Sequence, residues 1–527
     1  MSSLSDSAAY MRGSKNGYEV KLRDDAPHLL QIDGDACHHI HNITKHFSSE
    51  LDPENHLAHL IDDINRDFHY SPDIKSDFLN ICKILGVPDK QPKERVAHRW
   101  MSLLDSALSL DELADPLTVL YYSWLNTKDR ALYKDTIIKI FRNYKVSDAG
   151  RQTIYAAMRT LKLKEKNMSP KGVNRKQRVC VKIIYKRKIT DLLTKAVIEV
   201  FPRFKNFILA FETKRPMLHK LHDRMVQLFR DFLKYFIKAQ EIRASGKKLK
   251  ELNLCDKTKH IPIEHIPMGK CEDTLTSCSK EDILKFRTKL HSSFISTAKY
   301  MQKKLPLSNT VLSTLSLLDP LAFGQTETGI LLKKLPDFFP TIDAPGFSSE
   351  IMDMQADVDI VAAEGVDLDV WWSSVFKLNR YPSVEKVVTA CLSIFTGPRV
   401  EQSFSMMNNI ISSKTSSLLV TTYEAILFIK YLLLAQKTTA IKQTGAEHTL
   451  EVFMSLAREL PNVIKEEELG ALDSELRQFV IDDDVSMIDA DSTISSDVEF
   501  RLDTSWWTPI FHLTLKVELP DINICQG

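Results

Sequence analysis

The stretch DLLTKAVIEVFPRFKNFILAF, residues 191–211, decides the fold class. Its apolar side chains recur at intervals of three and four residues, which is the pattern of an amphipathic helix. The same pattern fills 51–160 and continues from 211 to 243. Few windows alternate with the two-residue period of a strand. The sequence therefore predicts a predominantly α-helical protein.

Composition limits the classes of protein that fit. The chain has 527 residues, enough for two or three domains, and its formal net charge is +1. Its eight cysteines are scattered without a CxxC motif, which favours a reducing compartment without a disulfide framework. The first 17 residues have no apolar core, so we expect no signal peptide there. The longest apolar run, 425–435, contains Lys430 and is too short for a bilayer, so we expect no membrane association.

One stretch, 161–190, departs from the overall charge balance. Eleven lysines and arginines and one acid, Glu165, lie between Lys162 and Lys188. Such a run is commonly a solvated surface, but it can also contact phosphates or act as an import signal. The candidates for weak, non-specific DNA contact are Lys182, Lys186, Arg187 and Lys188. Lysine contacts to phosphate carry no base sequence information.

Two segments are rich in histidine and cysteine: 37–41, which reads CHHIH, and 255–291. Zinc modules normally present two closely spaced ligand pairs. Neither segment has them, so we expect packing and loop roles rather than a metal site.

A set of motifs lies between 366 and 434: VDLDVWWSS (366–374), RYPSVEKVVTACLSIF (380–395), TGPRVEQSFSMMNNIISSK (396–414) and TTYEAILFIKYLLL (421–434). Together they resemble the C-terminal dimerisation region of hAT-superfamily transposases. The matching positions are Trp371, Trp372, Tyr381, Pro382, Glu401, Phe404 and Ser405, with Gln402 where the family usually has arginine. The resemblance implies a homodimer.

The residues predict the same layout. Pro382 suits a first helical turn, where a missing N–H costs little. A stripe follows it at Val384, Val387, Val388, Cys391, Leu392 and Phe395. The helix expected around 423–435 is apolar on nearly every face, so it must be buried on all sides. An ordinary core helix would satisfy that need, but the resemblance favours a place partly between two subunits for Ile426, Ile429, Leu432 and Leu433.

The N-terminal segment 5–42 resembles the hAT segment that follows the second catalytic aspartate. Asp6 matches that aspartate, and Asp35 and His38 match a (C/D)xxH motif. HRWMS (98–102) resembles a downstream Arg-Trp element at Arg99 and Trp100. The resemblance implies a remnant of an RNase H-like α/β fold, split by a large helical insertion.

In that fold two aspartates and a glutamate, here Glu401, hold divalent metal ions such as Mg²⁺. Only five residues precede Asp6, so the first aspartate has no counterpart. We therefore expect a nuclear, transposase-derived protein that acts through dimerisation, without strand-transfer catalysis or a cofactor. The alternative is an active transposase whose recorded sequence lacks its start. An unrelated helical scaffold is a third interpretation.

These interpretations give four regions: a partial RNase H-like segment (1–50), a helical insertion (51–365), the dimerisation region (366–440) and an acidic tail (441–527). The tail has seven acids and no base from Asp482 to Glu499, which predicts disorder. Within it, FVIDDDVSMID (479–489) resembles SUMO-interacting motifs, because an apolar, β-branched run precedes three aspartates. A chance apolar run in a disordered tail is the alternative.

Overall fold

The computed structural model describes residues 18–25, 35–96, 101–211, 215–243, 245–323, 326–338, 344–361 and 363–392. The chain divides into two compact units, Met1–Ser405 and Met406–Gly527, so every described residue belongs to the first unit.

The described residues are almost entirely helical. The α-helices are α2 (Tyr18–Asp25), α3 (Ala36–Leu51), α4 (His56–Tyr70), α5 (Pro72–Leu85), α6 (Ser102–Glu112), α7 (Ala114–Tyr121), α8 (Thr127–Leu132), α9 (Lys134–Asn143), α10 (Asp148–Lys164), α11 (Pro170–Cys180), α12 (Arg187–Phe211), α13 (Leu218–Leu233), α14 (Gly246–Lys250), α15 (Glu272–Leu275), α16 (Lys280–Lys304), α17 (Thr310–Leu315), α18 (Pro320–Phe323), α19 (Thr326–Leu332), α20 (Ala344–Ala356), α21 (Leu368–Phe376) and α22 (Pro382–Leu392). Among these residues the β-type pairing is one isolated antiparallel bridge, Ile237 with His260. The predicted helical class is therefore confirmed for the described part of the chain.

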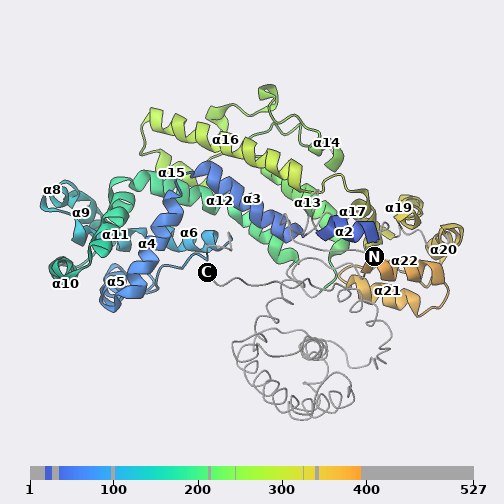
Figure 1. Cartoon of the computed structure of the whole chain (residues 1–527), viewed down its shortest axis with the longest axis horizontal. Coiled ribbons are helices and arrows are strands. Elements are labelled where there is room, and N and C mark those ends of the chain that lie inside the picture. The colour runs from blue at the N-terminus through green and yellow to red at the C-terminus, as the bar shows by residue number, and fades with distance from the viewer. Residues whose placement is uncertain are drawn as a thin grey trace, which may run out of the picture. The chain divides into compact units, whose positions relative to one another are not determined.

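Helix α12, which covers the helical pattern of 191–211, is the centre of the first group of helices. Helices α3, α6 and α13 all pack against it, and α16 packs against α3 and α13. Figure 1 shows α3, α12 and α16 side by side. The helices on the two sides of residue 50 therefore share one core, although the domain boundaries themselves stay a prediction.

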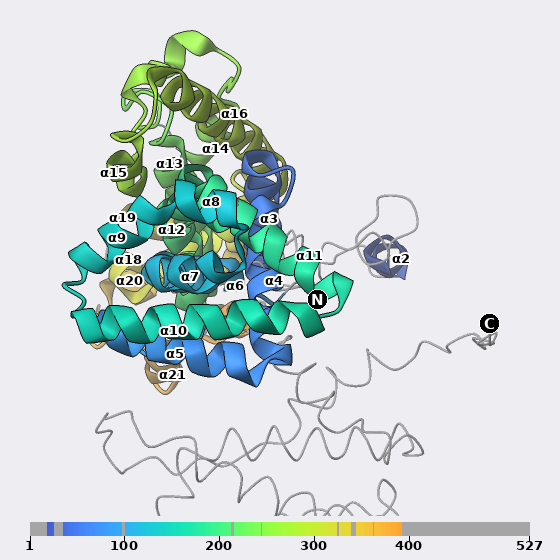
Figure 2. The ribbon, with the colours of Figure 1, turned by 90° about the vertical axis from the view of Figure 1, so that its left-hand side faces the viewer.

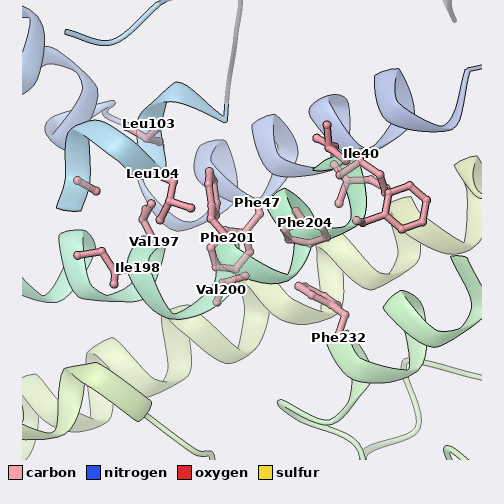
Figure 3. Close-up of a cluster of buried hydrophobic side chains, with 14 of the residues drawn as sticks. Ile40, Phe47, Leu103, Leu104, Val197, Ile198, Val200, Phe201, Phe204 and Phe232 are labelled. Carbon is pink, nitrogen blue, oxygen red and sulfur yellow. The ribbon is translucent and has the colours of Figure 1, made fainter. Parts of the chain in front are cut away.

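Aromatic side chains fill this core (Figure 3). Phe47 of α3 is fully buried, and its ring lies 5.8 Å from that of Phe294, 6.2 Å from Phe201 and 6.4 Å from Phe232, measured between centroids. Each of these rings comes from a different helix. Aromatic pairs at such distances add to the stabilisation that burial provides.

A second group of helices, α4, α5, α7, α10 and α11, packs together (Figure 2), and α4 joins this group to α12. A π-helical turn, η3 (Val181–Tyr185), joins α11 to α12, and the Lys186 amide donates to the Val181 carbonyl over 2.8 Å. A π-turn leaves a carbonyl without its usual partner. The Thr190 hydroxyl donates to the Lys182 backbone carbonyl over 2.7 Å, and the same hydroxyl lies 2.8 Å from His56 Nε2.

The last described helices, α17 to α22, form a smaller group beside α13. Helix α17 contacts α13, α20 contacts α19 and α22, and α21 contacts α22. This group contains the described part of the predicted dimerisation region.

Candidate dimerisation site

The start of α22 is capped by a side chain from another helix. Pro382 is the first residue of α22 and has no N–H to satisfy. The next two amides, of Ser383 and Val384, each donate to the Glu350 carboxylate of α20 over 2.8 Å. A carboxylate at this end also interacts favourably with the helix dipole. Glu350 therefore fixes where α22 begins and ties it to α20.

The buried face of α22 is the predicted apolar stripe. Val384, Val387, Val388 and Cys391 are each at most 1% exposed, and Leu392 is partly buried against them. Helices α20 and α21 both contact α22. Burial raises the pKa of the Cys391 thiol, so this side chain serves as a small apolar residue. Phe395, the last residue of the predicted stripe, lies outside the described residues.

The two tryptophans of α21 are structural anchors. Trp372 is fully buried, and its indole N–H donates to the Leu318 carbonyl over 3.0 Å. Trp371 donates to the Val361 carbonyl over 3.0 Å. The two rings meet edge to face at 4.9 Å, and both contact Phe323 of α18. They join α21 to the end of α17 and to the loop before α21.

The loop between α21 and α22 is held by the carboxylates of Asp357 and Asp359, and Asp359 pairs with Arg380 over 2.8 Å. Asp357 accepts hydrogen bonds from the Tyr381 hydroxyl over 2.5 Å and from Arg380 over 2.7 Å. These bonds, with the Asp359 amide, lower the pKa of Asp357 to about 2. Burial and the same carboxylate raise the pKa of Tyr381 to about 12. Asn379, at a φ of 53°, makes the left-handed step that ends α21, a conformation that asparagine tolerates.

The predicted dimerisation residues divide into two groups. Trp371, Trp372 and Tyr381 are 4%, 0% and 7% exposed within one chain, so they position helices rather than offer a surface. Pro382, at the start of α22, is exposed, and the remaining predicted contacts lie outside the described residues with the block around Glu401: Phe404, Ile426, Ile429, Leu432 and Leu433. Sequence reasoning missed Glu350 and Asp357, because no local signal marks a carboxylate that acts on a helix some 30 residues downstream.

The N-terminal motif residues are only partly described. Asp35 is the N-cap of α3, where its carboxylate accepts from the Cys37 amide over 2.8 Å, and His38 is half-buried in the first turn. Asp6, Arg99 and Trp100 lie outside the described residues. The structure therefore brings together two of these five positions, in a helix start that aspartate commonly caps.

Five of the eleven cations in the basic stretch 162–188 pair with acids elsewhere in the chain. Arg178 forms two bonds with Asp63 of α4, of 2.7 and 2.9 Å, and Arg175 and Lys176 both pair with Asp67. Earlier in the same stretch, Lys164 pairs with Asp73 of α5. These four cations therefore hold α11 against α4 and α10 against α5.

Three of the four nucleic-acid candidates have internal partners. Arg187 bonds to Asp191 over 2.8 Å and to the Thr118 hydroxyl over 2.7 Å. Lys182 donates to the His56 carbonyl over 2.9 Å, and burial lowers its pKa. Lys188 donates to the Ser277 carbonyl. Lys186 is exposed, and no acid among the described residues lies within ion-pair distance of it.

The histidine-rich and cysteine-rich segments bring two imidazoles together. His260 and His291 meet with ring centroids 5.1 Å apart, but no third ligand joins them. Across the described residues, no three His, Cys, Asp or Glu side chains are placed to hold a metal ion. None of the described helices is both long and apolar enough to cross a bilayer.

Comparison with known families decides the region's identity. Residues 348–433 match the hAT family C-terminal dimerisation region. The chain carries a hAT dimerisation region. The hAT region begins within α20, upstream of the predicted start at 366, and so includes the Glu350 cap of α22. No curated protein and no solved structure matches the chain.

Proposed function

We propose that this protein is derived from a hAT transposase and acts by forming a homodimer through its hAT region. The observation that carries the proposal is the match over 348–433. The first three helices of that region pack into one unit, held by the Glu350 cap and the buried face of α22. The rest of the region includes the run 425–435, which is apolar on nearly every helical face. Such a run needs cover from all sides, and a second subunit supplies it.

Light scattering on the purified chain tests this proposal. We expect a mass of about twice 60.3 kDa at micromolar concentration. Leu432→Asp should lower it to the monomer mass, because an unpaired carboxylate is costly to bury in an apolar interface. The matched control is Leu284→Asp, the same change at a half-exposed leucine of α16, outside the hAT region. A monomeric wild type, or equal dissociation by both variants, would rule out this interface.

We further propose that the 527-residue chain works without strand-transfer chemistry, in the nucleus, and that 1–50 derives from an RNase H-like fold. The support is the N-terminal resemblance, which supplies Asp6, together with Glu401 in the hAT region. Two carboxylates provide fewer oxygen ligands than the metal chemistry of that fold requires. We expect no nicking or joining of duplex DNA with Mg²⁺ or Mn²⁺. Metal-dependent nicking that Glu401→Gln abolishes would overturn this proposal.

A second partner, SUMO, is proposed for 479–489. An extended apolar run followed by Asp482, Asp483 and Asp484 suits addition to a sheet edge with a basic rim. A peptide of 475–495 should shift the edge-strand resonances of labelled SUMO, and Val480→Ala with Ile481→Ala should abolish the shift. An unshifted SUMO spectrum at millimolar peptide would remove this partner.

A further inference from the structure

Positive charge without an acidic partner among the described residues also gathers outside the basic stretch. It lies where α14 meets the C-terminal end of α16, a junction seen in Figure 1. We name this set the α14–α16 patch: Lys247, Lys248, Lys250, Lys299, Lys303 and Lys304. We infer that the patch binds the phosphate backbone of nucleic acid, without reading bases.

The fold holds the two halves of the patch together. The Gln302 side chain of α16 donates to the carbonyls of Leu249 and Leu252, each over 3.0 Å. Lys250 donates to the Ser308 hydroxyl over 3.2 Å. Leu249 is fully buried, which fixes the inner face of α14. The lysines therefore gather through tertiary structure, although they are far apart in sequence.

The close contact between the two halves depends on a glycine. A Cβ at Gly246 would lie 2.7 Å from the Leu307 carbonyl oxygen and 2.8 Å from a Val226 methyl group. Only glycine allows the start of α14 to come this near to the chain that follows α16. The patch thus sits on a rigid junction.

The charge of the patch is one-sided. Residues 245–251 contain three lysines and one acid, Glu251, and residues 299–309 contain three lysines and no acid. All six lysines lack an acidic partner within the described residues, and Lys304 alone is only half-exposed. The N-terminal half of α16 differs, because Lys285 there pairs with Glu281 over 2.7 Å.

Clustered like charges repel one another, and an anion with closely spaced charges relieves that repulsion. The helix dipole favours Lys303 and Lys304 at the end of α16, but it gives no reason for three more lysines on α14. A nucleic-acid backbone presents one charge about every 1.7 Å of duplex, so it can meet several ammonium groups at once. Lysines act there as point charges on phosphate and carry no sequence information. The chemistry of the patch therefore fits a backbone ligand.

The test compares two variants of the full chain that lose the same charge. The patch variant is Lys247→Gln, Lys248→Gln and Lys303→Gln. The control variant is Lys166→Gln, Lys171→Gln and Lys186→Gln, which removes exposed lysines of the basic stretch. Affinity for a labelled random-sequence DNA duplex is measured by anisotropy between low and physiological salt. Circular dichroism melting checks that both variants fold.

We expect the slope of log affinity against log salt concentration to be less steep in the patch variant. Each lost phosphate contact removes about 0.9 from the slope, so the three replaced lysines of one bound chain should remove about 2.7. The control slope should equal that of the wild type, and two unrelated duplex sequences should bind equally. An unchanged slope in the patch variant, an equal change in both variants, or no wild-type binding at low salt would overturn the inference. Light scattering should show the same oligomer for all three proteins, so the result is separate from dimerisation.

Discussion

At the scale of single residues, Asp67 shows how the basic stretch is used. It is 1% exposed, and its carboxylate accepts from the Tyr121 hydroxyl over 2.9 Å, from Lys176 over 3.1 Å and from Arg175. Burial lowers the pKa of Lys176, and Asp67 opposes that shift. The same ammonium lies 4.9 Å from the centre of the Trp124 ring. One buried acid thus makes two neighbouring cations compatible with the interior.

We expect Asp67→Asn to destabilise the protein strongly. The change leaves the buried Lys176 and the partly buried Arg175 without a counter-charge, and breaking a buried pair typically costs about 3–5 kcal/mol of unfolding free energy. Urea unfolding followed by circular dichroism measures the loss. The control is Asp148→Asn, whose carboxylate is 91% exposed beside Arg151 and should change stability little. Equal losses in the two variants would contradict the role given to Asp67.

At the scale of elements, α22 depends on α20 for its beginning. The Pro382 start is a local signal, but the acceptor for the two free amides comes from Glu350 on another helix. The cap therefore couples two elements of the hAT region. If the cap is lost, the first turn of α22 should fray. The second turn should stay helical, because its buried apolar side chains still pack against the core.

Glu350→Ala should cost about 0.5–2 kcal/mol, the usual range for loss of a helix cap. Amide hydrogen exchange in the first turn of α22 should be faster in the variant than in the wild type, because the capped amides lose their acceptor. Exchange in α12 should not change. Asp353→Ala removes an exposed acid from the same helix and serves as the control. Unchanged protection of the Ser383 and Val384 amides would show that the cap contributes nothing.

At the scale of the whole molecule, buried histidines make stability depend on pH. Burial lowers the pKa of His219 to about 4 and also lowers the pKa values of His56, His260 and His291. Asp319 opposes the shift at His219, and Lys220 adds to it. The unfolded chain binds protons at these histidines near pH 6.5, before the folded chain does. The stability that depends on keeping these histidines neutral is therefore fully present above pH 6.5, and it is lost as the pH falls toward 4.

We expect the free energy of unfolding to fall between pH 6.5 and 4, and the fall to be smaller in His219→Gln. Urea midpoints at half-unit pH steps measure it. His59→Gln changes an exposed histidine of α4 and should leave the profile as in the wild type. A His219→Gln profile parallel to that of the wild type would contradict the role assigned to this imidazole.

The features that could be predicted from sequence are those set by the spacing of residues within a single helix. The helical class, the Pro382 start and the stripe of Val384, Val387, Val388 and Cys391 all follow from spacing within one helix. The neutralisation of the basic stretch does not, because Asp63 and Asp67 precede their cations by more than 100 residues. Sequence analysis missed the α14–α16 patch for the same reason, because α14 and the end of α16 are about 50 residues apart in sequence and meet through tertiary contacts such as those of Gln302.

The Glu350 cap has a practical consequence for dividing the chain. A fragment that starts at residue 366 would contain the tryptophans and α22 but would omit both Glu350 and Asp357. Its first α22 turn would be open, and its Tyr381 hydroxyl would have lost its acceptor. A recombinant piece intended for crystallisation or for pull-down experiments should begin before Ala344, so that α20 is included.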